Sequence, residues 1–426
     1  MNPSTSFGRT RVQKAPSQSQ GTALGRKHRP DYSLLVAMML LVAIGLVVIY
    51  SVSPAISAQL KGNVDSNHFM YRQLIFLLLG FGVFFFTSLL PLKWWTHIQK
   101  YLILGAILSF VLLFIPAFSI THLGATRWVH IGPINYQPAE ILKFALVFSF
   151  AMFFAHRMRE GRMNETSTSR VFLGAMALVG LEIVIIQRDL GTMIPIVAIM
   201  LAMLYVAGIN KLTFVKITAL IIVAAGLAIL PFQHRRERVF TFLNSSADVE
   251  DSGYHINQAL IAVGSGGVFG KGLGRSVQAY GYLPEAANDS IFAVMAEKFG
   301  FIGVLCVFAV YGALLLRILY VSQRAPNHYL QLICVGVFAW MAIQAFVNVG
   351  AMLGIMPLTG VTLPFLSFGG TSLVFSMAAL GVVFNISRYI NLGRIDEKIA
   401  NGGATDENTH GRRGLGRSRY ATQSGR

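Results

Sequence analysis

Cysteine and charged residues are both scarce in this chain. Two cysteines, Cys306 and Cys334, occur among 426 residues, and only 12% of the residues are charged. Two cysteines within apolar stretches imply no disulfide framework and are typical of small packing residues. So few charges, with 54% hydrophobic residues and a mean hydropathy of +0.59, exclude an ordinary soluble domain. The composition therefore predicts a protein that crosses a membrane several times.

Long polar intervals are also missing from most of the sequence, which consists largely of apolar runs. A run of about 17 to 25 apolar residues is needed to cross the hydrocarbon core of a bilayer. We therefore predict an all-α polytopic membrane protein with about ten transmembrane helices. The ten runs are residues 32–53, 72–91, 101–118, 139–155, 170–187, 190–208, 212–231, 290–319, 329–353 and 371–388.

Acidic residues are few, with 18 Asp and Glu against 35 Lys and Arg, which gives a net charge of +17. Most of the basic residues lie in the tails 1–31 and 390–426 and in loops on the same side of the ten-helix domain 32–389. Since basic residues are retained on the cytoplasmic side, we expect both tails to be cytoplasmic and disordered, and 232–289 to form a large external loop. Attraction to anionic lipid accounts for the charge without nucleic-acid binding.

When the basic residues of the tails, the loops and the adjoining ends of the apolar runs are set aside, only Lys143 and Lys298 remain within the runs. Ionisable groups inside a membrane face the protein interior, find partners and are functional by default. Glu140 lies three residues before Lys143, so that the two share a helix face and are expected to form an ion pair. The alternative is that the pair only clasps helices together.

Two short stretches place more polar residues near that pair. The segment "GATRWVHIGPINYQPAEILKFA" is typical of the outer membrane interface and brings Arg127 and Gln137 close to the Glu140 face. The turn "QRDLGT" joins two spans so tightly that Asp189 is expected at the outer surface. Asp189 is either a site residue or the N-cap of the next helix.

The external loop contains "AVGSGGVFGKGLG", with six glycines from Gly264 to Gly274. Neither phosphate-loop pattern is complete there, which argues against a nucleotide site. Consecutive glycine amides next to Lys271 and Arg275 would suit the pyrophosphate of an external lipid substrate. Flexibility alone would explain the glycines equally well.

The stretch "GIMPLTGVTLPFLSFGGTS" (354–372) is apolar but interrupted by proline and glycine. Such backbone is tolerated at membrane depth only inside protein or beside a wet cavity, so we predict a re-entrant segment. Ser367 and Ser372 are candidates for contact with a sugar or phosphate, or they cap the final helix.

The stretch "PEAANDSIF" places Glu285 and Asp289 where the polar loop meets the eighth apolar run. Asp289 is either a helix N-cap or a general base for a substrate that reacts at headgroup height. Glu297 lies two turns deeper on a similar face, about 12 Å along an ideal helix.

Taken in order, these motifs resemble the SEDS family of bacterial peptidoglycan glycosyltransferases, which includes FtsW, RodA and SpoVE. The resemblance covers residues 32–389, and "GLGRSVQAYGYLPEA" is more similar to the cell-division members than to the elongation members. Asp289 aligns with the family's proposed catalytic acid. The sequence departs from the family pattern at Ala287, Asn288 and Ser290, and at Arg188, where the family has proline.

The resemblance implies polymerisation of lipid II on the outer face of the bacterial plasma membrane, at the division septum for a cell-division member. Asp289 would be the general base, and Arg127 and Lys143 would stabilise the leaving pyrophosphate. A divalent cation, Mg²⁺ or Mn²⁺, is a candidate, with no organic cofactor. A monofunctional class B penicillin-binding protein and other division proteins are the expected partners. Candidate substrate-binding residues are Arg127, Gln137, Glu140, Lys143, Asp189, Lys271, Arg275, Glu285, Glu297, Ser367 and Ser372.

Three other functions are compatible with these features. A lipid II flippase or transporter would also have ten spans and buried ionisable residues, but it would depend less on an acid at the outer rim. A non-catalytic scaffold for division proteins would tolerate a change of Asp289. An elongation polymerase would share the chemistry and differ in its partners.

Overall fold

The computed structural model describes residues 27–59, 65–122, 125–132, 134–230, 232, 236 and 252–390. The tails predicted to be disordered lie almost wholly outside these residues, as do residues 233–235 and 237–251 of the predicted external loop.

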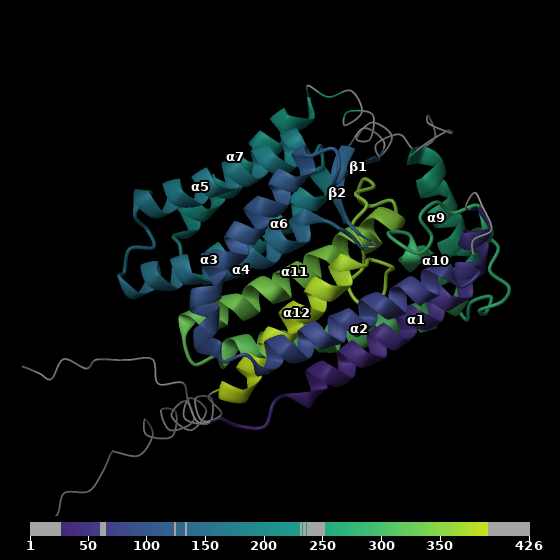
Figure 1. Ribbon diagram of the computed structural model, residues 1–426, viewed down its shortest axis with the longest axis horizontal. Helices are drawn as coiled ribbons and strands as arrows, with labels where there is room; N and C mark the ends of the chain where they lie inside the picture. The colour runs from purple at the N-terminus through teal and green to yellow at the C-terminus, as the bar shows by residue number, and fades with distance from the viewer. Residues whose placement is uncertain are drawn as a thin grey trace, which may run out of the picture.

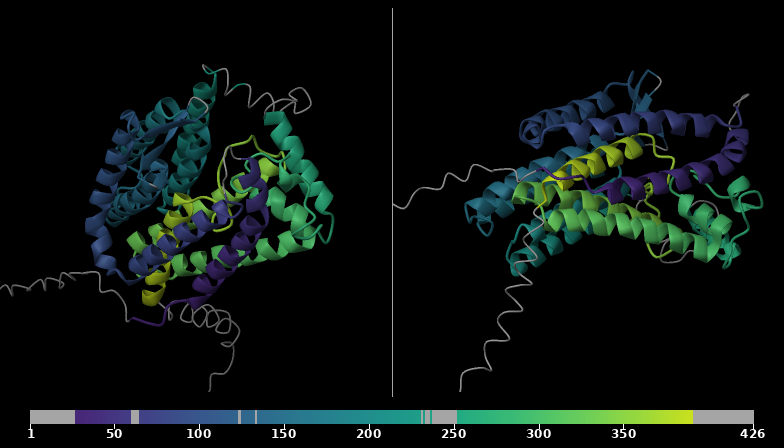
Figure 2. Two further views of the ribbon diagram at one scale, coloured as in Figure 1. Left: turned by 45° about the vertical axis from the view of Figure 1, so that its right-hand side comes forward. Right: turned by 90° about the horizontal axis from the view of Figure 1, so that it is seen from below.

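The predicted all-α membrane fold is confirmed. Nine helices of the described part are long and apolar enough to cross a membrane, and α6, of 17 residues, corresponds to the remaining predicted run, 190–208. Figures 1 and 2 show the long helices running roughly along one direction. The helices are α1 (Tyr32–Gln59), α2 (His68–Leu89), α3 (Leu92–Val111), α4 (Pro138–Arg159), α5 (Thr166–Gly180), α6 (Leu190–Val206), α7 (Lys211–Ile229), α9 (Ser252–Gly266), α10 (Ile291–Gln323), α11 (His328–Met352) and α12 (Thr371–Ile386).

The helices α11, α12 and α4 form the interior of the bundle. Most of their residues are buried, whereas α7 buries only Ile217. The helices α2 and α12 approach closely because a residue without a side chain lies at their contact. A Cβ on Gly80 would lie 2.5 Å from Met377 Sδ. The Thr87 hydroxyl donates across the same interface to Ala378 O at 3.1 Å. Small residues and hydroxyls of this kind are typical of helix contacts within membranes.

A small antiparallel sheet between α3 and α4 was not predicted. It has the order β1 (Ser119–His122), β2 (Ala125–Ile131) and β3 (Ile134–Tyr136). Trp128 on β2 is partly exposed, which suits the interfacial position expected for this stretch. The sheet lies at the end of the bundle away from the two ends of the described chain (Figure 1).

The two ends of the described chain meet at the opposite end of the bundle. The backbone amide of His28 donates to Arg388 O at 2.7 Å, and the amide of Asp31 donates to Ser387 Oγ at 2.9 Å. Both ends therefore lie on one side, as an even number of spans requires.

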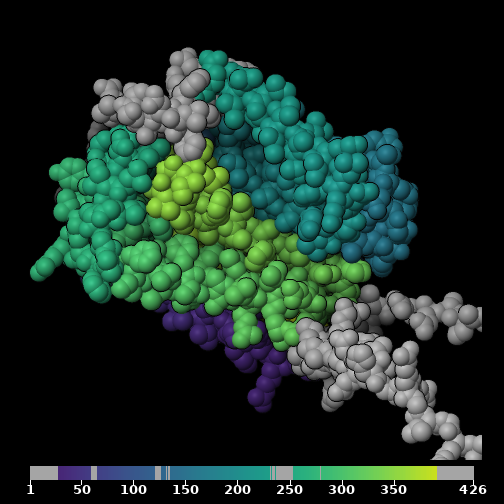
Figure 3. All heavy atoms as spheres, turned by 180° about the vertical axis from the view of Figure 1, so that it is seen from behind, coloured from purple at the N-terminus to yellow at the C-terminus, as the bar shows by residue number. Residues whose placement is uncertain are grey.

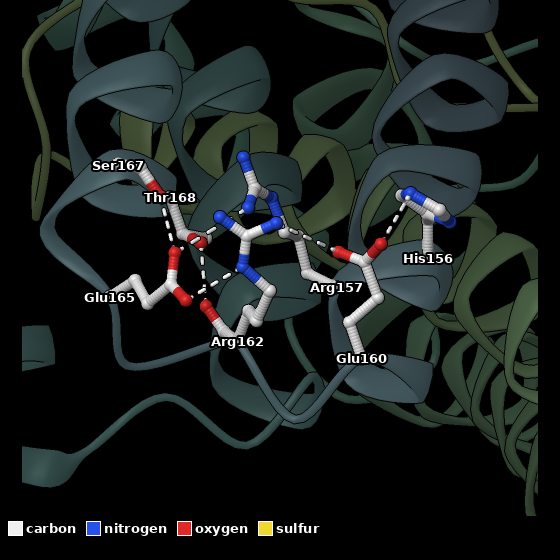
Figure 4. Close-up of polar contacts among 7 residues, drawn as sticks. All are labelled: His156, Arg157, Glu160, Arg162, Glu165, Ser167 and Thr168. Atoms are coloured by element: carbon white, nitrogen blue, oxygen red, sulfur yellow. Dashed lines mark hydrogen bonds and ion pairs between the residues drawn. The ribbon is translucent and has the colours of Figure 1, made fainter.

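The connection between α4 and α5 is closed by a network of charged residues (Figure 4). Arg162 Nε donates to Glu165 Oε1 at 2.6 Å, and His156 Nε2 lies 3.1 Å from Glu160 Oε1. The Ser167 hydroxyl donates to the other oxygen of Glu165 at 2.9 Å. Exposed pairs of this kind contribute little to stability because water and salt screen them, so the network shapes the turn more than it stabilises the fold.

The glycine-rich segment after α9 packs its backbone directly against α10. At Gly300 the dihedral φ is 67°, which interrupts the helix, and the amides of Lys271 and Gly272 donate to Glu297 O and Lys298 O at 2.9 and 3.0 Å. These amides are therefore occupied and are not free to bind an anion. Close backbone approach explains the glycines here, in place of the anion nest or flexibility considered from the sequence.

Gly266 and Gly264 provide a matched pair for testing this packing. A Cβ on Gly266 would lie 2.0 Å from Ala296 O, whereas a Cβ on Gly264 would meet nothing within 4 Å. We expect Gly266→Ala to destabilise the protein by on the order of 1–3 kcal/mol through overpacking. Gly264→Ala should be neutral or stabilising by up to about 1 kcal/mol, because alanine favours the helix. Thermal unfolding in detergent measures both, and equal midpoints would contradict the packing.

Candidate functional site

The segment between α11 and α12, residues 354–370, is the centre of the candidate site, and we call it the broken segment. It contains no helix, as predicted, and most of it from Thr359 onward is buried. The amide of Phe368 donates to Ala287 O at 2.8 Å, and Gln73 Nε2 on α2 donates to Ser367 O at 3.4 Å. A Cβ on Gly191 of α6 would lie 2.0 Å from Thr359 O. The broken segment thus joins α2, α6 and the loop before α10.

The Asp289 turn, residues 284–290, lies against this segment. The helix α10 begins at Ile291 with Ser290 at its N-cap, so Asp289 is not the capping residue considered from the sequence. Asp289 Oδ1 is buried and has no hydrogen-bond partner among the described residues. Asp289 Oδ2 lies 3.9 Å from where a Cβ on Gly360 would be. The oxygen Oδ1 therefore lies unpaired in the interior, and Oδ2 lies next to a glycine of the broken segment.

Burial of this carboxylate raises the pKa of Asp289 to about 7, and the neighbouring negative charge of Glu285 adds to the rise. A carboxyl group with such a pKa exchanges a proton near neutral pH. This property suits a general acid or base.

Two further contacts shape the Asp289 turn. Glu285 is exposed with a φ of 49°, and its side chain accepts a hydrogen bond from Asn288 Nδ2. Ser290 Oγ donates to Pro284 O at 2.8 Å and lies 2.7 Å from His255 Nε2 on α9. The serine that departs from the family pattern therefore ties the turn to α9.

Arg127, Gln137 and Asp189 come together, whereas the sequence predicted Arg127 and Gln137 near the Glu140 face and Asp189 only at the outer surface. Asp189 caps α6 by accepting bonds from the Thr192 amide at 3.2 Å and the Thr192 hydroxyl at 2.7 Å. Arg127 Nε lies 3.6 Å from Asp189 Oδ2, and Gln137 Nε2 donates to Thr192 Oγ1 at 3.3 Å. The capping alternative for Asp189 is thus present, while contact with substrate stays a prediction.

The turn before Asp189 explains a second departure from the family pattern. Arg188 has a φ of 58°, and its carbonyl accepts a bond from Arg127 Nη2 at 3.0 Å. Proline fixes φ near −65°, so a proline could not adopt this conformation. The backbone here requires a residue other than the family's proline.

The predicted ion pair between Glu140 and Lys143 is confirmed. Lys143 Nζ donates to Glu140 Oε1 at 2.8 Å, and both side chains are buried. Lys143 Nζ also lies 4.9 Å from the ring centroid of Trp340 on α11. Glu140 Oε2 is buried without a partner among the residues that the structure describes. Lys143 lies at the level of Trp340. Along α11, Trp340 is two helical turns, or about 12 Å, from Asn348, the residue that contacts Asp289.

Lys271 and Glu297 form an ion pair at 3.3 Å, and Arg275 is exposed. Glu297 is fully buried and also accepts bonds from the amides of Val277 and Gln278 at 2.8 and 3.3 Å. Glu297 therefore anchors the loop that follows the glycine-rich segment. Its contact with substrate, and those of Lys271 and Arg275, stay predictions.

The hydroxyls of Ser367 and Ser372 are used inside the broken segment. Ser367 Oγ accepts a bond from the Leu363 amide at 2.9 Å, and Ser372 Oγ accepts one from Thr362 Oγ1 at 3.1 Å. Both side chains are buried. These bonds stabilise the turns of the segment.

Sequence reasoning missed Asn348, Gln73 and His255. Asn348 on α11 is buried and donates from Nδ2 to both Asp289 O at 2.7 Å and Val361 O at 2.8 Å. A signal was available, because an asparagine in a long apolar run is costly in a membrane unless it finds partners.

A hollow opens beside the broken segment. Figure 3 shows it between that segment, in yellow-green, and α7, in teal. Because α7 buries only Ile217, little of the described part of the chain packs against this side of the hollow.

Comparison with known proteins gives consistent results. Residues 31–392 match the FtsW/RodA/SpoVE family, described as "Cell cycle protein". Stage V sporulation protein E of Bacillus subtilis (strain 168) is 36% identical over 366 residues, which cover 85% of this chain and 98% of that protein. The "Probable peptidoglycan glycosyltransferase FtsW" of Pseudomonas fluorescens (strain SBW25) is 32% identical over 394 residues, or 91% of this chain and 96% of that one.

Solved structures agree with this result. A chain of a peptidoglycan synthase complex, described as coordinating polymerization and crosslinking, has a TM-score of 0.68 and 25% identity over 84% of this chain and 98% of its own. The rod shape determining protein RodA of Thermus thermophilus has a TM-score of 0.59 and 25% identity, with coverage of 85% and 98%. The chain therefore belongs to the FtsW/RodA/SpoVE family of multi-pass membrane proteins.

Proposed function

We propose that this protein is a peptidoglycan glycosyltransferase that polymerises lipid II into glycan strands at the outer face of the plasma membrane during cell division. The observation that carries the proposal is the Asp289 carboxylate beside the broken segment, whose Oδ1 is buried without a hydrogen-bond partner among the described residues, at the end of the bundle away from the chain ends. The glycosyltransferase names of the relatives support the same reaction.

Asp289 acts as the general base in this mechanism. It removes the proton from the 4-hydroxyl of the acceptor's GlcNAc as that oxygen attacks C1 of the donor's MurNAc. The bond from C1 to the lipid pyrophosphate breaks, and the pyrophosphate leaves with the electron pair. A pKa of about 7 lets Asp289 accept the proton and return it to water near neutral pH.

Basic side chains near the site would stabilise the charge that develops on the leaving pyrophosphate. Arg127 is the best placed of them, because it lies at the sheet end of the bundle and is partly exposed. Lys143 is buried and paired with Glu140, so its contribution requires the substrate to reach deeper into the bundle. The hollow beside α7 would accommodate the lipid chain of such a substrate (Figure 3).

Oxygen atoms at the site fit a divalent cation, Mg²⁺ or Mn²⁺. Asp289 Oδ1 and Thr359 Oγ1 are both buried without hydrogen-bond partners among the described residues. Hard cations prefer oxygen ligands, and Mg²⁺ is commonly held by one or two carboxylates together with substrate phosphates. A bound cation would supply charge neutralisation at the pyrophosphate.

The partner and the orientation follow from the same proposal. The similarity to a chain of a polymerising and crosslinking complex supports a monofunctional class B penicillin-binding protein as the transpeptidase partner. The meeting of both chain ends on one side supports two cytoplasmic tails, with the Asp289 end outside.

The first test replaces Asp289 in the protein purified with its penicillin-binding partner. We expect Asp289→Asn to lower lipid II polymerisation by at least 100-fold, because the amide cannot accept the proton. Glycan strands separated on a gel, with and without a chelator, measure the product. Full activity of the variant would remove Asp289 from the mechanism. Movement of lipid II across vesicles without polymerisation by wild type would favour the flippase.

The second test uses pH. Because the base must be ionised, the polymerisation rate should rise as pH increases through about 7. Glu285→Gln removes the neighbouring negative charge, so it should move this rise to lower pH, by less than one unit because burial is the larger cause. An unchanged midpoint in Glu285→Gln would show that the rise belongs to another group.

The raised pKa of Asp289 also predicts an effect on stability. The ionised form is the less favourable one in the folded protein, so wild type loses stability as pH rises from about 4 through about 7. At pH 8 we therefore expect Asp289→Asn to be more stable than wild type, by on the order of 2 kcal/mol. At pH 4 the difference should disappear, and thermal unfolding at both pH values measures it.

The Glu140–Lys143 pair can be tested for a role beyond packing. Lys143→Met leaves a buried carboxylate unpaired and should cost about 3–5 kcal/mol. The double variant Glu140→Gln/Lys143→Met should recover most of that stability. If Lys143 stabilises the leaving group, the double variant stays at least tenfold less active than wild type. If the double variant recovers activity together with stability, the Glu140–Lys143 pair only helps to pack the helices.

A further inference from the structure

Asn348 connects three parts of the site through one side-chain amide. It lies on α11, is almost fully buried, and its Nδ2 donates to Asp289 O at 2.7 Å and to Val361 O at 2.8 Å. The two acceptors belong to the Asp289 turn and to the broken segment. Because both N–H groups of the amide are used, its orientation is fixed.

The bond to Asp289 O holds the backbone of the residue itself. The other contacts of the turn lie on either side of it, at Ala287 O, which accepts from the Phe368 amide, and at Ser290, which contacts His255. Asn348 is thus the contact that sets how far Asp289 enters the bundle, and α11, most of which is buried, provides a rigid support.

The amide oxygen of Asn348 points to a role beyond stability. Asn348 Oδ1 is buried without a hydrogen-bond partner in the described part of the chain. A buried acceptor without a partner destabilises the folded protein. An apolar residue of the same size would avoid that cost, and proteins typically tolerate such costs at functional sites.

We propose that Asn348 is a positioning residue for the glycosyl transfer, whose amide holds the Asp289 backbone so that the carboxylate lies at the correct depth for proton abstraction. This inference rests on the proposed function. A displacement of about 1 Å at a reacting group costs on the order of 100-fold in rate, so loss of the amide should lower kcat by 10- to 100-fold. KM for lipid II should change less than threefold.

Asn385 on α12 offers a matched control. It is also buried, and its Nδ2 also donates to two backbone carbonyls, Leu90 O at 2.5 Å and Thr87 O at 3.4 Å. It lies fourteen residues after Thr371, where α12 begins next to the site, which is about 21 Å along the helix. Asn385→Leu therefore removes the same kind of bridge at the other end of the bundle.

The experiment compares Asn348→Leu, Asn348→Ala and Asn385→Leu with wild type, each purified with the penicillin-binding partner. Thermal unfolding, kcat and KM of lipid II polymerisation are measured for each. We expect all three variants to unfold at lower temperature, and only the Asn348 variants to lose kcat.

Two results would overturn the inference. If kcat falls equally in the Asn348 and Asn385 variants, Asn348 is structural. If KM rises while kcat is unchanged, Asn348 binds substrate instead of positioning Asp289. An inactive wild type, or a fully active Asp289→Asn, would instead reject the proposed function, so the two failures are distinguishable.

Discussion

The candidate site depends on one constraint, namely that backbone without regular secondary structure inside a membrane must find its hydrogen bonds within the protein. In the broken segment between α11 and α12, backbone carbonyls accept bonds from the side chains of Gln73 and Asn348. One backbone amide of the segment donates to its own Ser367 Oγ, and another donates to Ala287 O. Because the same bonds connect the segment to the turn that carries Asp289, satisfying the backbone also places the acid. The contacts that satisfy the backbone of the broken segment are therefore the same contacts that position the candidate catalytic acid.

The acids of this region differ in how fully they are satisfied. Glu297 accepts bonds from a hydroxyl, a lysine and two backbone amides, and Asp189 accepts both the amide and the hydroxyl of Thr192. Asp289 has a buried oxygen with no partner among the described residues. Fully paired carboxylates hold loops and helix ends in place, whereas a carboxylate oxygen without a partner remains available to a substrate proton.

The sequence predicted the helices well, because each apolar run carries its own signal of length and composition. It also predicted the Glu140–Lys143 pair, which is set by helical spacing alone. The small sheet, the pairing of the glycine-rich segment with the kink at Gly300, and the role of Asn348 were not predicted. These features depend on contacts between distant residues, such as Asn348 and Asp289, 59 positions apart, and no local pattern encodes such contacts.

The slight packing of α7 has a consequence for the membrane around the protein. This helix has 19 residues, so it is about 28 Å long, close to the roughly 30 Å thickness of a hydrocarbon core. It packs chiefly against α6, and little protein fixes its tilt. A thicker bilayer would favour an upright α7 and a thinner one a tilted α7, so the width of the hollow beside the broken segment follows bilayer thickness. Lipid composition would thereby change the width of one side of the site.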